Sequence, residues 1–204
     1  MADIILAGST SGAITISAPA ISGTNTLTLP AVTDTLVGLA ATQTLTNKSI
    51  VASQLTGTVA AARLPAGSVL QVVNSTYATA TSNSTTTAAS TGLTASITPA
   101  SISNKILVIV NISSVQNNNS GNGVNLILYR NSTALYTFGT IHGYTTSAIV
   151  TVTSGGGTTH LDSPATTSAT SYTVYFASNT GSGQVVTVQA NGAESAITLM
   201  EIQG

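Results

Sequence analysis

The sequence predicts an all-β protein in two parts, a slender N-terminal part over residues 1–67 and a β-sandwich, jelly-roll-like head over residues 68–204. Apolar and polar residues alternate over short runs separated by Gly, Asn and Ser, and no window keeps a helical period. All six Tyr and both Phe follow residue 68. Charged residues make up 4% of the chain, against roughly 25% in ordinary soluble domains, so Ser, Thr, Asn and Gln must cover the surface.

The N-terminal part has too few apolar residues for a core of its own. Between Ile14 and Leu64 they occur singly or in pairs, about one in every four to six residues. Alternation at 13–17 and at 26–29 predicts two short strands, which turn residues soon interrupt. A disordered tail would be less apolar, so we expect several copies of this part to share one core along a thin rod.

The two parts meet within residues 61–73. Pro65 fixes its own φ and pushes Leu64 out of the helical region, while Gly67 is free to adopt a left-handed backbone. This pattern predicts a turn, followed by a strand that begins at Ser68.

About nine short strands are expected in the head, because runs rich in Val, Ile, Thr and Tyr are separated by Gly, Asn and Ser loops. They span residues 68–73, 93–97, 105–112, 124–129, 134–138, 148–152, 172–176, 185–189 and 196–202. The run 106–110 predicts a central strand buried on both faces, since on an edge it would invite aggregation. Ile109→Asp is then expected to prevent folding. The Thr/Ser tract at 79–91 fits either a linker or an exposed edge strand.

Several segments resemble stretches that recur in the fibres of tailed bacteriophages. They are GTNTLTLPA (residues 23–31), QTLTNKSI (43–50) and ARLPAGSVLQV (62–72). LDSPATTSATSYTVYF (161–176) and the closing AITLMEI (196–202) look like the C-terminal head of such fibres, particularly in phages of aquatic bacteria. The resemblance covers most of the chain, although the chain is short for a long tail fibre and its first twelve residues contain no recognised attachment module.

The resemblance implies a homotrimeric virion fibre with a trimeric shaft. Residues 1–67 would attach to other virion proteins and form the shaft, and the head would adhere to a glycan or protein on the bacterial surface without catalysis. Such segments also occur in side fibres and head-attached fibres. A structural capsid decoration or collar fibre is therefore the alternative, and a polysaccharide-depolymerising spike is a third reading.

Composition argues against several other classes of function. The four basic residues are isolated from one another in the sequence, so no nucleic-acid partner is expected. The longest apolar stretches have about five residues, far short of the roughly 20 that span a bilayer, so no membrane insertion is expected. Asp3 stands where a secretory signal needs bases, which indicates synthesis in the host cytoplasm before assembly into the virion. Without Cys the chain has no disulfides.

Residues able to carry chemistry are few. Glycosidases use a pair of carboxylates a few ångströms apart, and the head offers only Asp162, Glu194 and Glu201, so no catalytic residue is expected. His160 and Asp162 would share one side of a strand and suit a metal. We interpret them instead as a loop His beside a turn Asp that caps the backbone at Ser163. No metal or cofactor is therefore expected.

Four polar segments are the candidate contact surfaces, at residues 116–123, 139–146, 154–160 and 179–183. Amide side chains donate and accept hydrogen bonds at once, and an aromatic face packs on the C–H groups of a sugar. The receptor-contact candidates within these segments are Asn117, Asn118, Asn119, Asn122, His142, Tyr144, His160 and Asn179.

The scarcity of charge predicts stability that is insensitive to pH and salt. Only five carboxylates and two His are available to change protonation on unfolding, and few opposite charges can form surface ion pairs. We expect the melting temperature to stay nearly constant from about pH 5 to 9 and up to about 0.5 M salt. Thermal melts across this grid check it, and a steep loss near pH 6 would contradict it and implicate His142 or His160.

Overall fold

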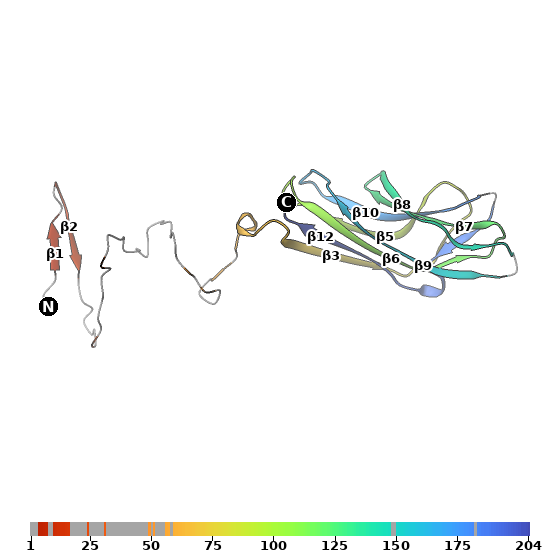
Figure 1. The fold of residues 1–204 in the computed structure, drawn as a ribbon, viewed down its shortest axis with the longest axis horizontal. Coiled ribbons are helices and arrows are strands. Elements are labelled where there is room, and N and C mark those ends of the chain that lie inside the picture. Colours follow the sequence, from red (N-terminus) through yellow and green to blue (C-terminus); the bar gives the residue numbers. More distant parts are fainter. Residues whose placement is uncertain are drawn as a thin grey trace. The chain divides into compact units, whose positions relative to one another are not determined.

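A computed structural model describes residues 4–7, 10–16, 24, 31, 49, 51, 56–57, 59–147, 150–181 and 183–204. The chain forms two compact units, Met1–Thr56 and Gly57–Gly204 (Figure 1). Every regular element in the described part is a β-strand except two short 3-10 helices, η2 (Ala61–Arg63) and η3 (Ala190–Gly192). The predicted all-β class is confirmed, whereas the roles given to residues 1–67 and 68–204 stay predictions.

The described strands of the first unit form an antiparallel hairpin. β1 (Ile4–Ala7) pairs with β2 (Ala13–Ile16). The alternation at 13–17 predicted β2 correctly, β1 was not predicted, and the strand predicted at 26–29 lies outside the described residues. Ile5 is 66% exposed, so this apolar side chain stays on the surface of the unit.

The second unit begins with a turn that leads into its first strand. Both the amide and the hydroxyl of Ser68 donate to the Pro65 carbonyl oxygen, at 3.2 and 2.7 Å, and Gly67 takes a left-handed φ of 88°. Strand β3 (Val69–Tyr77) starts one residue after the predicted position. The Gly67 amide donates to the Gln203 carbonyl oxygen at 2.8 Å, so the turn is fastened to the C-terminal end of the chain.

Within the described residues, the larger sheet of this unit has six antiparallel strands in the order β3-β12-β6-β11-β4, with β9 paired to β6. The other bounds are β4 (Thr81–Asn83), β6 (Lys105–Asn117), β9 (Val152–Asp162), β11 (Val186–Val188) and β12 (Ser195–Ile202). β9 occupies one edge of β6, and β12 and then β11 occupy the other. The register is irregular between Ile112 and Val115, where Ser114 has a φ of 48°.

The smaller sheet has the antiparallel order β5-β10-β7-β8. Its bounds are β5 (Ala89–Ile97), β7 (Asn122–Arg130), β8 (Thr133–Thr145) and β10 (Thr170–Ser178). Alternate residues of strands in both sheets contribute to one buried core. It includes Leu93, Ile97, Ile106, Val108, Val110, Ile112, Leu126, Leu128, Tyr172, Val174, Phe176, Ile197 and Leu199. Two sheets around a shared core make this unit a β-sandwich.

Two predictions about the head strands need correction. β6 is central, but its 106–110 run is not buried on both faces, because Ile109 is 38% exposed while Val108 is fully buried. An antiparallel sandwich covers only one face of each sheet, so successive residues alternate between core and surface. Of the strand predicted at 148–152, residues 148–149 lie outside the described residues, and β9 begins at Val152. The tract at 79–91 contains β4 and the start of β5.

This alternation predicts opposite outcomes for two neighbouring substitutions. Val108→Asp should prevent folding of the second unit, because an unpaired buried charge costs several kcal/mol against a total stability of about 5–15 kcal/mol. Ile109→Asp should leave the unit folded, since its side chain points away from the core. Circular dichroism and thermal melts of both variants test this, and equal behaviour of the two would contradict the register of β6.

Candidate functional site

Three of the four predicted contact segments meet at one end of the second unit, away from the C-terminus (Figure 1). We call residues 116–123, 141–147, 150–152, 179–181 and 183–187 the distal end. Backbone amides join its parts, from Gly121 to the Thr145 carbonyl oxygen at 2.7 Å and from Asn179 to the Gly123 carbonyl oxygen at 2.9 Å. The Asn119 side chain donates to the Val185 carbonyl oxygen at 2.6 Å.

The loops predicted at 139–146 and 154–160 are wrong, because these residues lie largely in β8 and wholly in β9. Three consecutive glycines at 155–157 gave the second segment the composition of a loop. In the sandwich the middle glycine, Gly156, makes room for a neighbouring side chain. A Cβ built on Gly156 would stand 2.3 Å from the Leu126 side chain.

Asn117 and Asn122 are buried and serve the structure of the distal end. Asn117 is 1% exposed. Its side-chain nitrogen Nδ2 donates to the backbone carbonyl oxygen of Asn122 at 2.8 Å and to that of Gly143 at 3.1 Å. Asn122 is fully buried, and its side-chain oxygen accepts from the amide and hydroxyl of Thr180 at 3.1 and 3.0 Å. Their burial argues against a direct receptor contact and makes them the supports of the surface residues.

Asn118, Tyr144 and Asn179 are exposed at the distal end, and Asn119 is partly exposed. Tyr144 exposes 52% of its surface. Sequence reasoning missed a pocket of about 140 Å³ that Asn118 lines together with Gln116, Thr151, Val185 and Thr187. Amides and hydroxyls around one apolar side chain provide donors, acceptors and a patch for C–H groups. No local signal reveals this pocket, because its residues come from three separate segments.

His142 packs between strands, so its ring is only partly available for contact. His142 in β8 lies opposite Val124 in β7. A Cβ built on Gly139 would stand 2.2 Å from His142 Nε2. The ring therefore occupies space that the glycine leaves open. This placement gives His142 a packing role at the distal end.

His160 lies away from the other candidates. It is in β9 opposite Val108, and its ring centroid is 4.9 Å from that of Tyr136, whose hydroxyl bonds to Thr158. Its interpretation as a loop residue is wrong, since β9 continues to Asp162. The structure does not bring His160 to the distal end.

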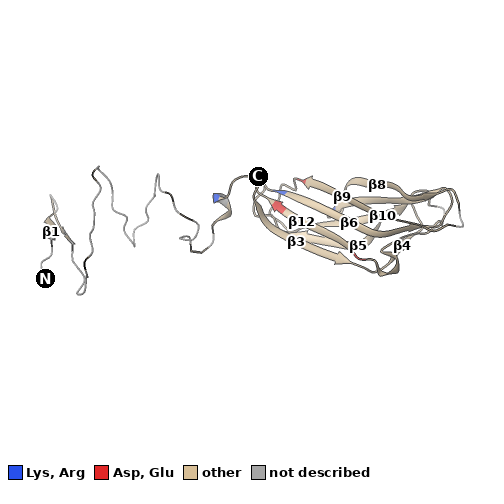
Figure 2. Ribbon diagram, turned by 60° about the horizontal axis from the view of Figure 1, so that its bottom comes forward, with Lys and Arg blue, Asp and Glu red and all other residues tan. Residues whose placement is uncertain are grey.

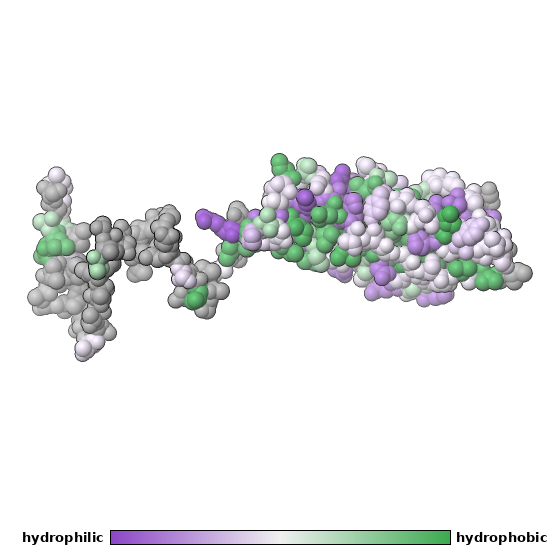
Figure 3. Space-filling view, viewed as in Figure 1, coloured by the Kyte–Doolittle hydropathy of each residue, from purple (hydrophilic) through white to green (hydrophobic). Residues whose placement is uncertain are grey.

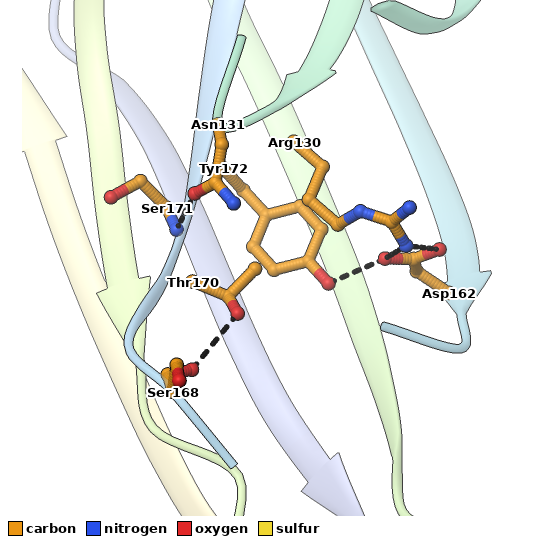
Figure 4. A network of polar contacts seen from close by, with 7 residues as sticks. All are labelled: Arg130, Asn131, Asp162, Ser168, Thr170, Ser171 and Tyr172. Atoms are coloured by element: carbon orange, nitrogen blue, oxygen red, sulfur yellow. Dashed lines mark hydrogen bonds and ion pairs between the residues drawn. The ribbon is translucent and has the colours of Figure 1, made fainter. Parts of the chain in front are cut away.

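Asp162 is held by an arginine and a tyrosine from the opposite sheet (Figure 4). Arg130 Nη1 donates to both carboxylate oxygens at 2.9 Å, and the Tyr172 hydroxyl donates to Oδ2 at 2.6 Å. Burial, and then the bond to Asp162, raises the pKa of Tyr172 far above its ordinary value. Asp162 thus fastens β9 to β7 and β10 and does not cap Ser163. Among the described residues no three His, Asp or Glu side chains could together hold a metal.

Glu201 is a fully buried carboxylate at the opposite end of the sandwich from the distal end. Gln71 Nε2, the Ala100 amide and Asn104 Nδ2 donate to it at 2.6, 2.7 and 2.5 Å. Burial alone would raise the pKa of Glu201, but these three hydrogen bonds outweigh it and lower the pKa. The carboxylate therefore joins β12, β3 and the turn after β5.

A second hollow, of about 250 Å³, lies near Glu201 where the chain enters the sandwich. It is lined by Ala61, Leu70, Ala100, Ser101, Ser103, Asn104, Gln203 and Gly204. Among its polar side chains, the Asn104 side-chain nitrogen is bonded to Glu201, and the Ser101 and Ser103 hydroxyls are bonded to each other. We therefore regard this hollow as a gap beside the entering segment.

Charge and the distal end are separated in this unit. Lys105 lies opposite Ile202, and Ile106 lies opposite both Glu201 and Asp162, so these charges gather near the C-terminus. Figure 2 shows blue and red segments at or near that end. The sequence of the distal end contains no Lys, Arg, Asp or Glu. Any ligand there must be recognised through neutral hydrogen bonds and apolar contact.

No protein-family model matches the chain, and no curated protein does. In the part that the structure describes, no helix has the length and apolar character needed to cross a membrane. The geometry of the distal end is therefore the main structural guide to function.

The lowered pKa of Glu201 predicts that the second unit loses stability in acid. It also predicts that replacing the carboxylate by a neutral group lowers the free energy of unfolding. A folded-state pKa below the unfolded value near 4.3 adds stability above that pH, which is lost as the pH falls through the folded pKa. Glu201→Gln should cost about 1–3 kcal/mol at pH 7, because its amide would face another donor, and should weaken the acid dependence. Glu194→Gln, at an exposed position, is the control. Equal urea unfolding curves for both variants at pH 7 would contradict this role.

Proposed function

We propose that the chain is a virion fibre protein of a tailed bacteriophage, which adheres to a glycan or protein on the bacterial surface without catalysis. The uncharged distal end carries this proposal. It combines exposed Asn118, Tyr144 and Asn179 with a polar pocket, all supported by the buried amides of Asn117 and Asn122. Such a surface suits neutral sugar, whose hydroxyls need donors and acceptors and whose ring needs an apolar face.

The head is, in this proposal, a jelly roll. If the short strands β4 and β11 are set aside, β3-β12-β6-β9 form one sheet and β5-β10-β7-β8 the other. Successive strands then alternate between the sheets, except for the hairpin of β7 and β8. Eight strands in two four-stranded sheets with this alternation support the jelly-roll assignment, an architecture common in viral and lectin domains.

Residues 1–67 form the trimeric shaft in this proposal and attach the fibre to other virion proteins. The sparse apolar spacing of this part and the exposure of Ile5 in β1 support it, because both leave apolar surface for other copies. In this proposal the fibre is synthesised in the host cytoplasm and projects from the outer surface of the virion.

A structural capsid decoration or collar fibre is the second candidate function. The resemblance of the N-terminal segments extends to head-attached fibres, and this candidate differs in placing the shaft on the capsid and giving the distal end no receptor. A depolymerising spike has less support, since Asp162 and Glu201 are both engaged in internal hydrogen bonds. Release of reducing ends from host polysaccharide would be its signature.

Adhesion through the distal end predicts the effect of removing its exposed aromatic ring. Tyr144→Ser should weaken binding of the labelled full-length protein to host cells about tenfold, the equivalent of about 1.4 kcal/mol of lost contact. Ile102→Ser, at a 67% exposed position before β6, should bind like the wild type. Flow cytometry with a non-host strain as background measures both. If Tyr144→Ser bound host cells as the wild type does, the distal end would not be the surface that contacts the host.

A further inference from the structure

The outer face of the larger sheet carries apolar side chains in register across four strands. Met200 in β12 lies opposite Val72 in β3 and opposite Leu107 in β6, and Leu107 lies opposite Leu161 in β9. Their strand neighbours, such as Leu199, are buried in the core, so these four side chains point outward.

One exposed apolar residue in each adjoining row extends this surface, although the other residues in the row of Ile109 are Asn74, Thr198 and Thr159. Val69 lies on one side of the row and Ile109 on the other, and they are 51% and 38% exposed. Val72 and Leu161 are 55% and 50% exposed. We call Val69, Val72, Leu107, Ile109, Leu161 and Met200 the outer apolar face. Figure 3 shows green, hydrophobic residues gathered over the half of this unit nearer the C-terminus.

We propose that the outer apolar face is the surface through which the heads of different copies of this chain contact one another. This proposal rests on the proposed function as a homo-oligomeric fibre and names the surface that the oligomer uses. Adjacent exposed apolar side chains on the face of a sheet mark an interaction site. The alternating, flat pattern of β-strands lets one such face lie against another.

Charge on this face favours a like copy over other partners. Among the described residues that point outward from β3, β12, β6 and β9, Lys105 is the one charged side chain, and it lies at the margin. Two copies therefore meet without like-charge repulsion. An acidic partner would find no basic patch, and a bilayer surface would find neither a basic cluster nor Trp or Tyr anchors.

The position of β3 gives a second argument for a like copy. β3 pairs with β12 alone, which makes it an edge of the sheet, and its sequence from Val69 to Tyr77 has no charge or proline to protect that edge. It is also the strand into which residues 57–68 lead from the N-terminal part. An unprotected edge strand can pair with a strand of a like copy.

Thiol accessibility tests this surface in the full-length protein, because the chain has no Cys of its own. Val72→Cys and Leu161→Cys place a thiol on the outer apolar face. Val185→Cys, at a 47% exposed position of the distal end, is the matched control. We expect Ellman's reagent to react with the two face thiols at least about tenfold more slowly than with the control, since the contact must open first. Thermal melts confirm that each variant is folded.

Light scattering on the same samples separates the two proposals. Slow reaction of the thiols on the outer apolar face, in a protein that scatters light as a trimer, supports the assignment of this face as the contact between heads. A trimer whose face thiols react as fast as the control overturns the assignment while leaving the oligomer intact. A monomer overturns both the assignment and the trimeric fibre, and slow thiols in a monomer would show that the chain covers this face itself.

Discussion

The sandwich depends on one constraint, the strict alternation of inward and outward side chains on strands whose inner residues share a single core. β6 shows it most clearly, since Ile106, Val108 and Val110 enter the core while Leu107 and Ile109 leave it. The same constraint decides where glycine is needed, because Gly139 and Gly156 leave the space that His142 and Leu126 fill. One-sided burial then leaves an apolar outer face wherever the outward residues are also aliphatic.

Charged residues are few in this chain, and the buried carboxylates of Asp162 and Glu201 have structural roles. Asp162 links the two sheets through Arg130 and Tyr172, and Glu201 fastens the end where the chain enters. On the surface, hydroxyl pairs across strands take the place that ion pairs hold in other proteins. The hydroxyl oxygens of Ser96 and Ser171 lie 2.6 Å apart, and those of Thr94 and Thr173 lie 2.8 Å apart. Neutral pairs are not screened by salt, which suits the extracellular role that we propose.

The fold class and most strand positions could be predicted, because alternation and β-branched composition are local signals. The run 172–176 and the closing 196–202 lie within β10 and β12. β9 was missed in part because its three consecutive glycines resemble a loop. The role of Gly156 is visible only when the Leu126 side chain is packed against it. Three of the predicted contact segments, 116–123, 139–146 and 179–183, meet at the distal end, but 139–146 lies largely in β8 and the burial of Asn117 was not predicted. Its partner Gly143 is 26 residues away, and local sequence does not show that pairing.

The position of the chain on a virus particle tests the account most directly. If the proposed function holds, particles of the encoding phage can be labelled with gold-conjugated antibody raised against residues 57–204. The account predicts gold on fibres that project from the particle and end in a compact head. Gold spread evenly over the capsid shell would favour the decoration alternative, and particles that carry no gold at all would contradict a virion fibre.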